Sequence, residues 1–429
     1  MTSEITAEIE NLAVGGAFIG KVTSQPEQGM KVFIPYVAPG EKVHARITKR
    51  CESYLEAQVI EIDQPSPQRI SPVCPYYQQC GGCELQHGSY QAQLVWKYEM
   101  IKSALKARGA ENLSSLLAPI VASPPYGYRR RVTLHLSKEG QLGFYQPNSR
   151  TVVTVQSCAV ATLDINRLLP KLQNILSSYA GAIIRVALEQ GIEGVHVIFY
   201  LAKRIAREEV EKLLSHVKAD VTGATVLEGE TVVAQTGSSV VRLEIPTAGD
   251  KIVELPPGAF SQVNWEINSA LVSAVLQRIQ ADSTNQIIDL YSGAGNFSLP
   301  LALQGHAVIA VEVEKRLVDL GIDNVIRFKL GKQLKFIQST VEKFVKDELK
   351  FHFGATVIAD PPRSGLGKVA MNMSAAGKIL LISCHLPSFI RDVVFMSQHG
   401  WKVKEIIPFD MFAQTAYVEI LTVLERERR

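Results

Sequence analysis

The chain has 429 residues, and its 45 lysines and arginines exceed its 42 aspartates and glutamates by three. This length exceeds one compact core and predicts several domains, since a domain usually holds about 100–200 residues. Apolar residues make up 46% and charged residues 20%, which excludes a wholly disordered chain. No apolar run approaches the ~18 residues of a membrane span, and the acidic start is unlike a signal peptide. We therefore expect a cytoplasmic protein with no membrane partner.

The basic excess lies in one stretch of the sequence. Residues 66–150 hold 10 basic against 4 acidic side chains, whereas residues 1–65 hold 6 against 9. A local basic excess is a common property of surfaces that bind polyanions. The stretch 66–150 is therefore a candidate nucleic-acid contact.

Residues 1–65 have the pattern of a small β domain. Short runs that alternate apolar and polar residues are separated by Gly/Pro turns such as 37–40. These runs cover residues 8–14, 31–36, 42–48 and 56–62. Five short strands at this spacing predict an OB-like barrel, a frequent nucleic-acid module. A linker with two prolines at 63–68 marks the end of the barrel.

Two further domains are expected, over residues 66–255 and 256–429. The first has a mixed α+β pattern and begins with a helix at about 90–109, which we expect to pack on the C-terminal domain. In the second, helical segments alternate with buried strand runs at 286–291, 307–312, 355–360 and 379–384. Strands and helices in alternation predict a doubly wound, Rossmann-like α/β sheet.

Three of the six cysteines, Cys74, Cys80 and Cys83, lie within ten residues. The two glycines between Cys80 and Cys83 allow a tight turn whose amides can donate to sulfur. Clustered cysteines in a cytosolic chain favour metal binding over disulfides, and Cys158 is the natural fourth ligand. The spacing favours an iron–sulfur cluster. A zinc site with four thiolates is the alternative, because sulfur ligation serves both metals.

The C-terminal half carries polar residues directly after its buried strands. The turn at 289–298 contains Gly293 and Gly295 but lacks the third glycine of the dinucleotide fingerprint, so it need not bind a pyrophosphate. Glu312 ends the next strand, where a carboxylate can accept hydrogen bonds from the ribose hydroxyls of an adenosyl ligand or of NAD. Asp360 and Cys384 end two further strands. Ligands bind at this carboxyl edge in such sheets.

Taken together, these motifs resemble the family of S-adenosylmethionine-dependent RNA uridine-C5 methyltransferases. The resemblance is to the branch that has an N-terminal TRAM domain and an iron–sulfur cluster and acts on 23S rRNA. It extends along nearly the whole chain. In the N-terminal half it covers residues 80–87, 90, 93, 126–131, 143–145 and 158. In the C-terminal half it covers residues 257–264, 289–297, 311–312, 360–366, 383–384, 391–392 and 418–419.

The resemblance implies a role for each motif. It implies a [4Fe–4S] cluster on Cys74, Cys80, Cys83 and Cys158. It implies S-adenosylmethionine contacts from Gln262, Tyr291, Glu312 and Asp360. It implies that Cys384 is the nucleophile and Glu419 the proton acceptor. The expected RNA contacts are Arg129, Arg130, Arg131 and Phe260. The expected partner is 23S rRNA, with tRNA as the alternative, and we expect a monomer.

The chemistry explains why a thiol and a carboxylate are needed. Carbon 5 of uracil is too weak a nucleophile to accept a methyl group unaided. A thiolate that adds to carbon 6 turns the ring into an enolate, whose carbon 5 can then attack the methyl group. The proton left on carbon 5 must pass to a base before the thiolate leaves. A free thiol with a pKa of about 8.5 is mostly protonated, so the site should activate Cys384.

Two motifs depart from the usual family pattern. Residues 383–387 read Ser-Cys-His-Leu-Pro where the family usually has Ser-Cys-Asn-Pro, and residues 417–419 read Tyr-Val-Glu in place of His-Val-Glu. Both catalytic residues are kept, so the departures concern substrate positioning. Two other functions stay open: a non-catalytic RNA-binding or ribosome-assembly protein on the same scaffold, and a zinc-containing α/β oxidoreductase that uses NAD.

Overall fold

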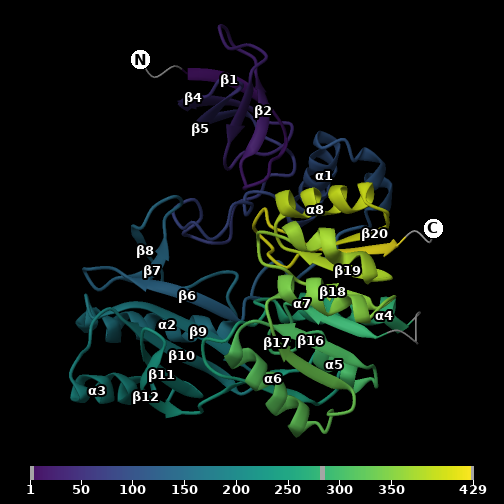
Figure 1. Ribbon diagram of the computed structural model, residues 1–429. Helices are drawn as coiled ribbons and strands as arrows, with labels where there is room; N and C mark the ends of the chain where they lie inside the picture. Colours follow the sequence, from purple (N-terminus) through teal and green to yellow (C-terminus); the bar gives the residue numbers. More distant parts are fainter. Residues whose placement is uncertain (1–3, 281–285, 427–429) are drawn as a thin grey trace.

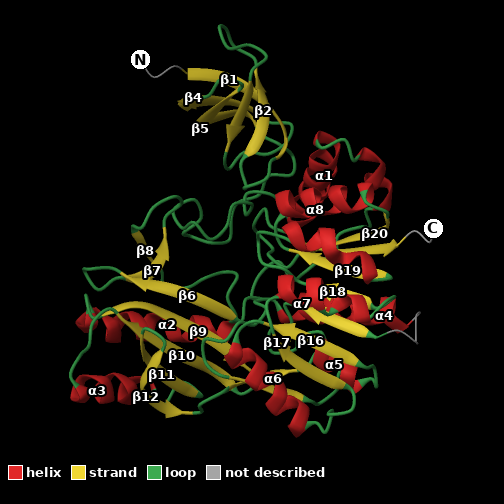
Figure 2. Ribbon diagram, viewed as in Figure 1, coloured by secondary structure: helices red, strands yellow, loops and turns green. Residues whose placement is uncertain are grey.

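A computed structural model describes residues 4–280 and 286–426. The described chain forms a closed five-stranded barrel, two seven-stranded sheets and one two-stranded hairpin. The barrel lies apart from the two large sheets (Figure 1) and consists of strands and loops (Figure 2), whereas both large sheets carry helices. None of the helices in this part of the chain is both long and apolar enough to cross a membrane.

The barrel confirms the β domain expected at the N-terminus. Its strands are β1 (Glu4–Leu12), β2 (Phe18–Val22), β3 (Lys31–Ile34), β4 (Lys42–Arg50) and β5 (Tyr54–Gln64). They close in the order β1-β2-β3-β5-β4. Along β1, Ile5, Ala7 and Ile9 are buried and alternate with exposed residues, as the period of two in a strand requires.

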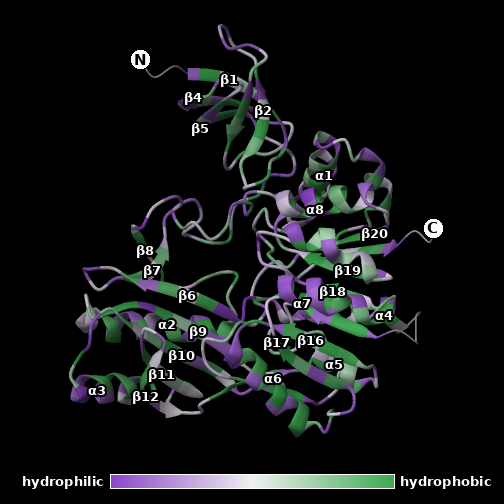
Figure 3. Cartoon of the chain, viewed as in Figure 1, coloured by the Kyte–Doolittle hydropathy of each residue, from purple (hydrophilic) through white to green (hydrophobic). Residues whose placement is uncertain are grey.

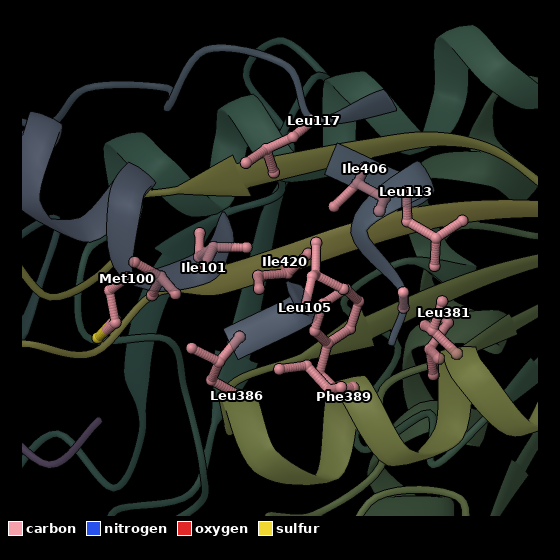
Figure 4. Close-up of a cluster of buried hydrophobic side chains, with 14 of the residues drawn as sticks. Met100, Ile101, Leu105, Leu113, Leu117, Leu381, Leu386, Phe389, Ile406 and Ile420 are labelled. Carbon is pink, nitrogen blue, oxygen red and sulfur yellow. The ribbon is translucent and has the colours of Figure 1, made fainter. Parts of the chain in front are cut away.

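The helix expected at 90–109 is α1 (Tyr90–Ala107), which lies between the barrel and the C-terminal sheet. The Ser89 side chain accepts a hydrogen bond from the Ala92 amide at its start, and Gly109 follows its end with a φ of +69°. The helix contacts β1 on one side and α8 (Leu386–Gln398) on the other. Figure 4 shows Ile101 and Leu105 among the side chains of α8 and of the last strands.

The chain after α1 runs along the edge of the C-terminal sheet. A short 3-10 helix, η1 (Glu111–Leu116), leads into residues 117–121, which pair in parallel with β20 (Trp401–Phe409). The Ala118 amide donates to the Ile406 carbonyl at 2.8 Å, and the Val121 amide donates to the Pro408 carbonyl at 2.9 Å. This segment therefore covers the edge strand.

The middle sheet has the order β12-β11-β10-β9-β6-β7-β8. Its strands are β6 (Arg131–Leu136), β7 (Leu142–Tyr145), β8 (Val152–Thr154), β9 (Ile183–Gly191), β10 (Gly194–Leu201), β11 (Gly223–Glu228) and β12 (Thr231–Gly237). Its helices are α2 (Leu163–Leu176), η2 (Ser177–Tyr179) and α3 (Arg207–Val217). Apolar residues of α2 and α3 join those of the strands in one buried cluster. This agrees with the mixed α+β pattern of the sequence.

The C-terminal sheet has the order β17-β16-β15-β18-β19-β21-β20 and confirms the doubly wound α/β expectation. Its remaining strands are β15 (Ile287–Leu290), β16 (Val308–Glu312), β17 (Leu334–Gln338), β18 (Thr356–Ala359), β19 (Lys378–Ser383) and β21 (Glu419–Arg426). Its helices besides α8 are α4 (Trp265–Gln280), α5 (Ser298–Leu303), α6 (Lys315–Arg327), α7 (Val341–Asp347), η3 (Leu349–Phe351) and η4 (Gly367–Ala375). Hydrophobic residues concentrate in these strands (Figure 3). The strand order reverses at β15, so a ligand site is expected at its carboxyl end.

A two-stranded hairpin connects the middle and C-terminal sheets. Its strands are β13 (Val241–Glu244) and β14 (Ile252–Leu255). Leu243 and Leu255 lie in the same buried cluster as Leu271 of α4. The hairpin thus packs on the C-terminal core, although the sequence-based boundary at 255 assigns it to the middle domain.

Candidate active site

A cavity of about 470 Å³ lies at the carboxyl edge of the C-terminal sheet, where the strand order reverses. It is formed by the ends of β15, β16, β18 and β19, the start of β21, and the segment before α4. All six residues expected to bind S-adenosylmethionine or to act in catalysis line it: Gln262, Tyr291, Glu312, Asp360, Cys384 and Glu419. The fold therefore brings together residues that are up to 157 positions apart in the sequence.

The turn after β15 brings backbone amides to the cavity. Tyr291, Gly293 and Gly295 have φ values of 61°, 56° and 101°, in the left-handed region that favours glycine. The Gly293 amide donates to Oε2 of Glu312 at 3.0 Å. Oε1 of Glu312 accepts hydrogen bonds from the next backbone amides, Val313 at 2.7 Å and Glu314 at 2.9 Å. The Glu312 carboxylate is thus fixed at the end of β16.

Asp289 is a fully buried carboxyl group beneath this turn. Its Oδ2 accepts a hydrogen bond from the Ser298 hydroxyl, while Oδ1 has no partner within the described structure. Burial, followed by the nearby Asp360 and Glu312 carboxylates, raises the pKa of Asp289 to about 7. The sequence motif included Asp289, but sequence reasoning assigned it no role.

Asp360 directly follows β18, and its carboxyl group lines the cavity. Burial raises its pKa to about 6. Two prolines follow it, and the guanidinium of the next residue, Arg363, lies 4.9 Å from the centre of the Tyr417 ring. Arg363 is therefore an additional charged residue beside the site, and the Asp-Pro-Pro-Arg motif was its only signal in the sequence.

Cys384 and Glu419 lie at the same end of two paired strands, β19 and β21. Ser383 of β19 pairs with Ile420 of β21 in antiparallel register, so Cys384, which follows β19, and Glu419, which begins β21, are the next residues at this end of the two strands. Burial and the carboxylates of Glu419 and Asp360 raise the pKa of the Cys384 thiol to about 11. Burial and Asp360 also raise the pKa of Glu419 well above its ordinary value. Both groups thus favour their protonated forms in the free protein.

A second cavity, of about 520 Å³, is lined by all four of the cysteines expected to bind a metal, Cys74, Cys80, Cys83 and Cys158. Burial raises the pKa of Cys80 to about 11 and that of Cys83 to about 12. A hydrogen bond from the Gly82 amide to Cys80 and one from the Gln86 side chain to Cys83 act in the opposite direction. Over residues 4–280 and 286–426, however, no three histidine, cysteine or acidic side chains are close enough to hold a metal ion. The thiols share a cavity without forming a closed ligand set.

Cys158 lies in a loop and not at the end of a strand. The preceding strand, β8, ends four residues earlier at Thr154. The loop is instead fixed by Asn166 of α2, whose Oδ1 accepts from the Cys158 amide at 2.7 Å and whose Nδ2 donates to the Cys158 carbonyl at 3.0 Å.

Two of the three arginines expected to contact RNA, Arg130 and Arg131, are engaged with protein groups. Arg131 forms an ion pair with the buried Glu189 at 3.1 Å and donates to the Ala259 carbonyl at 2.8 Å. Arg130 pairs with Glu244 at 3.0 Å. Arg129 lines the cysteine cavity.

Phe260, by contrast, is 69% exposed and lines both cavities. Its ring is exposed where the two cavities meet, and its role as an RNA contact stays a prediction.

Comparison with known proteins gives consistent results. The family description "tRNA (Uracil-5-)-methyltransferase" matches residues 89–427, and the TRAM domain matches residues 2–60. A "23S rRNA (uracil(1939)-C(5))-methyltransferase RlmD" of Shewanella woodyi is 29% identical, covering 99% of this chain and 96% of the relative. The protein of that name from a Marinomonas species is 30% identical, covering 94% and 91%.

Among solved structures, the fold is similar to that of the Pyrococcus abyssi tRNA (uracil-54, C5)-methyltransferase. The TM-score is 0.74 at 21% identity, and the match covers 97% of this chain and 99% of the other. That protein was solved in complex with S-adenosyl-L-homocysteine.

Proposed function

Because this chain belongs to the tRNA (uracil-5-)-methyltransferase family, we propose that it methylates carbon 5 of a uridine in 23S rRNA, with S-adenosylmethionine as methyl donor. The observation that carries the proposal is that Cys384, just after β19, and Glu419, at the start of the paired strand β21, line one cavity together with the fixed carboxylate of Glu312. The relatives named for 23S rRNA support this substrate over tRNA.

The methyl donor fits the carboxyl edge of the sheet beside Gln262, Tyr291, Glu312 and Asp360. S-adenosylmethionine supplies an electrophilic methyl group on a sulfonium. The Glu312 carboxylate is fixed by backbone amides and is suited to accept hydrogen bonds from the ribose hydroxyls. The turn at 291–295 leaves the amides close to the ligand without the third glycine that a pyrophosphate site uses.

Cys384 and Glu419 divide the remaining chemistry. The Cys384 thiolate forms a bond to carbon 6 of uracil, and the electron pair of the 5,6 double bond moves into the ring enolate. Carbon 5 then uses that pair to form its bond to the methyl group, while the bond between the methyl group and the sulfonium breaks and its electrons go to the sulfur of the departing S-adenosylhomocysteine. Glu419 takes the proton from carbon 5, and the electrons of the C–H bond restore the double bond as the Cys384 sulfur leaves.

The charges around Cys384 determine how easily the thiolate forms. Glu419 and Asp360 oppose ionisation of the thiol, while the positive Arg363 favours it. Arg363 is therefore the chain's own contribution to activating the nucleophile. Because Glu419 must accept a proton, the carboxylate form has to be populated when the adduct is resolved.

The four clustered cysteines are the proposed ligands of a [4Fe–4S] cluster. The support is that Cys74, Cys80, Cys83 and Cys158 line one cavity, and that hydrogen bonds from Gly82 and Gln86 reach two of the sulfurs, as is common for cluster ligands. A bound cluster would join the segment 74–83 to the loop at Cys158. Iron, sulfide and zinc analysis of anaerobically purified protein tests this; zinc without iron would contradict it.

A trapped adduct tests the catalytic proposal. RNA in which 5-fluorouridine replaces uridine has no removable proton on carbon 5, so the methylated adduct on Cys384 should persist on a denaturing gel. We expect this adduct with a 23S rRNA transcript and wild-type protein, and none with Cys384→Ala. An adduct with tRNA alone would shift the substrate to tRNA. Methyl donor and RNA binding without any adduct or methyl transfer would favour a non-catalytic RNA-binding protein.

A further inference from the structure

A buried ion pair joins helix α1 to the connection between β20 and β21. Nζ of Lys97 lies 2.5 Å from Oδ1 of Asp410, and neither side chain has any solvent exposure. The two residues are 313 positions apart in the sequence. Removing two charges from water is costly, and well-packed apolar residues are often at least as stabilising as a buried pair. Stability alone therefore does not explain why these two charges are buried here.

The remaining hydrogen bonds of Lys97 go to the same connection. Its Nζ donates to the Phe412 carbonyl at 3.2 Å and to the Tyr417 carbonyl at 3.1 Å. An ammonium has three protons, so the three contacts with residues 410–417 use all of them. Oδ2 of Asp410 in turn accepts from the Tyr90 hydroxyl at 2.8 Å, about two turns before Lys97 on α1. Three residues of the segment 410–417, namely Asp410, Phe412 and Tyr417, thus bind one ammonium group.

This connection leads directly into the catalytic cavity. Phe412 lines the cavity, and Glu419 begins β21 two residues after Tyr417. Tyr417 also lies against the Arg363 guanidinium. The carbonyls that Lys97 binds therefore belong to Phe412, which lines the cavity wall, and to Tyr417, two residues before the proton acceptor Glu419.

Buried apolar contacts hold helix α1 in place, so the backbone that carries the Lys97 side chain is fixed. Figure 4 shows Ile101 and Leu105 packed with Leu386 and Phe389 of α8, close to Ile420 of β21. Ile101, Leu105 and Phe389 are fully buried. Lys97 thus connects a rigid helix, through a short polar network, to the chain segment that carries Glu419.

We propose that Lys97 is a positioning residue that places the Glu419 carboxylate for proton removal from carbon 5. The inference rests on the proposed function. It assigns to Lys97 and Asp410 no contact with RNA or methyl donor: they act through the path of residues 410–418. A positioning defect should therefore slow the last chemical step more than the earlier ones, because thiolate addition and methyl transfer do not use Glu419.

The test is the fate of the adduct on ordinary RNA. With Lys97→Met, a 23S rRNA transcript and S-adenosylmethionine, we expect kcat to fall about 10- to 100-fold, since misplacement by about 1 Å can cost 10²-fold. The methylated, Cys384-linked RNA should accumulate on a denaturing gel without any fluorouridine. Glu419→Gln should give the same band, and KM for RNA should stay within about twofold of wild type.

Two further variants separate positioning from folding. Lys97→Met leaves Asp410 buried without its partner, which alone can unfold a protein. The double variant Lys97→Met/Asp410→Leu removes both charges, so no unpaired charge is buried and the protein should fold. It also lacks the hydrogen bonds from Lys97 to Phe412 and Tyr417, so it should still accumulate the adduct. Lys102→Met is the matched control: it lies on the same helix, its ion pair with Glu99 at 2.9 Å is partly exposed, and it should turn over at the wild-type rate.

The outcomes are distinct. Adduct accumulation in the double variant, with wild-type thermal stability, supports positioning. Turnover at the wild-type rate in a folded double variant, or slow turnover without any accumulated adduct, overturns it. If the wild-type protein forms no fluorouridine adduct, the proposed function itself fails and the positioning role fails with it.

Discussion

The two cavities of this protein use the same side chain in different surroundings. In the cavity at the edge of the C-terminal sheet, Cys384 lies near Glu419 and Asp360, and burial together with these carboxylates raises the pKa of its thiol. In the second cavity, four cysteines line one space, and the amide of Gly82 donates a hydrogen bond to the sulfur of Cys80. Burial raises the pKa of thiols in both places.

The difference lies in what can follow deprotonation. A single thiolate beside a base can add to a substrate and leave again. Several thiolates around one space repel one another unless a cation is shared between them. The neighbours of a cysteine, and not its burial, therefore separate the proposed nucleophile from the proposed ligands. The shared residues Phe260 and Ser261 line both cavities, so the two sites are adjacent.

The largest expected effect is a separation of the two cavities by mutation. Cys384→Ala should lower methyl transfer at least about 10³-fold, because no other group can form the adduct, and should leave bound iron unchanged. Cys158→Ala should lower bound iron and retain the fluorouridine adduct. The measurements are methyl incorporation into a 23S rRNA transcript and metal analysis of the same samples. A folded Cys158→Ala protein that forms no adduct would show that the cavities are not independent.

A smaller effect should appear in the reactivity of the Cys384 thiol. Because its pKa is raised to about 11, its modification by iodoacetamide should rise about tenfold per pH unit between pH 7 and 9. Asp360 has a pKa of about 6 and is ionised at pH 8, so Asp360→Asn should speed modification there about three- to tenfold. Peptide mass spectrometry follows the residue directly, with Cys384→Ala as control. A rate that levels off below pH 8 would argue against the carboxylate effect.

The smallest expected effect concerns stability at the buried Asp289. Its pKa of about 7 in the folded protein exceeds the ordinary value of 3.8, so the folded state holds the proton more tightly. This contribution to stability is fully present below about pH 4 and is lost as the pH rises through 7. Asp289→Asn cannot ionise, so its Tm relative to wild type should increase from pH 5 to pH 8, by about 2–4 °C. Thermal unfolding at both values checks this, and a larger difference at pH 5 would contradict it.

Local patterns were enough to predict the strand ends that bear chemistry. Glu312 and Asp360 could be placed at one edge because each ends or follows a buried run in an alternating α/β pattern, and parallel strands share their carboxyl edge. The same patterning predicted the barrel and helix α1. Strand boundaries were less accurate: β1 spans Glu4–Leu12 where residues 8–14 were expected, because an alternating run does not show where pairing starts.

Contacts between distant segments could not be predicted in this way. The proximity of Cys384 and Glu419 depends on antiparallel pairing of β19 with β21, which no local pattern encodes. The Lys97–Asp410 pair is equally invisible in the sequence, because a lysine on an amphipathic helix ordinarily faces solvent. The packing of the β13–β14 hairpin on the C-terminal core is a further tertiary choice that composition does not reveal.

The segment at 117–121 has a consequence for how the molecule can be divided. By pairing with β20, it shields the outermost hydrogen-bonding groups of the sheet from other chains. A fragment that begins at residue 256 would lack this cover and would expose the edge of β20. Exposed strand edges pair with other chains, so we expect this fragment to self-associate. The methyltransferase half should thus stay dispersed in solution only when expressed together with the preceding stretch from residue 89 onward.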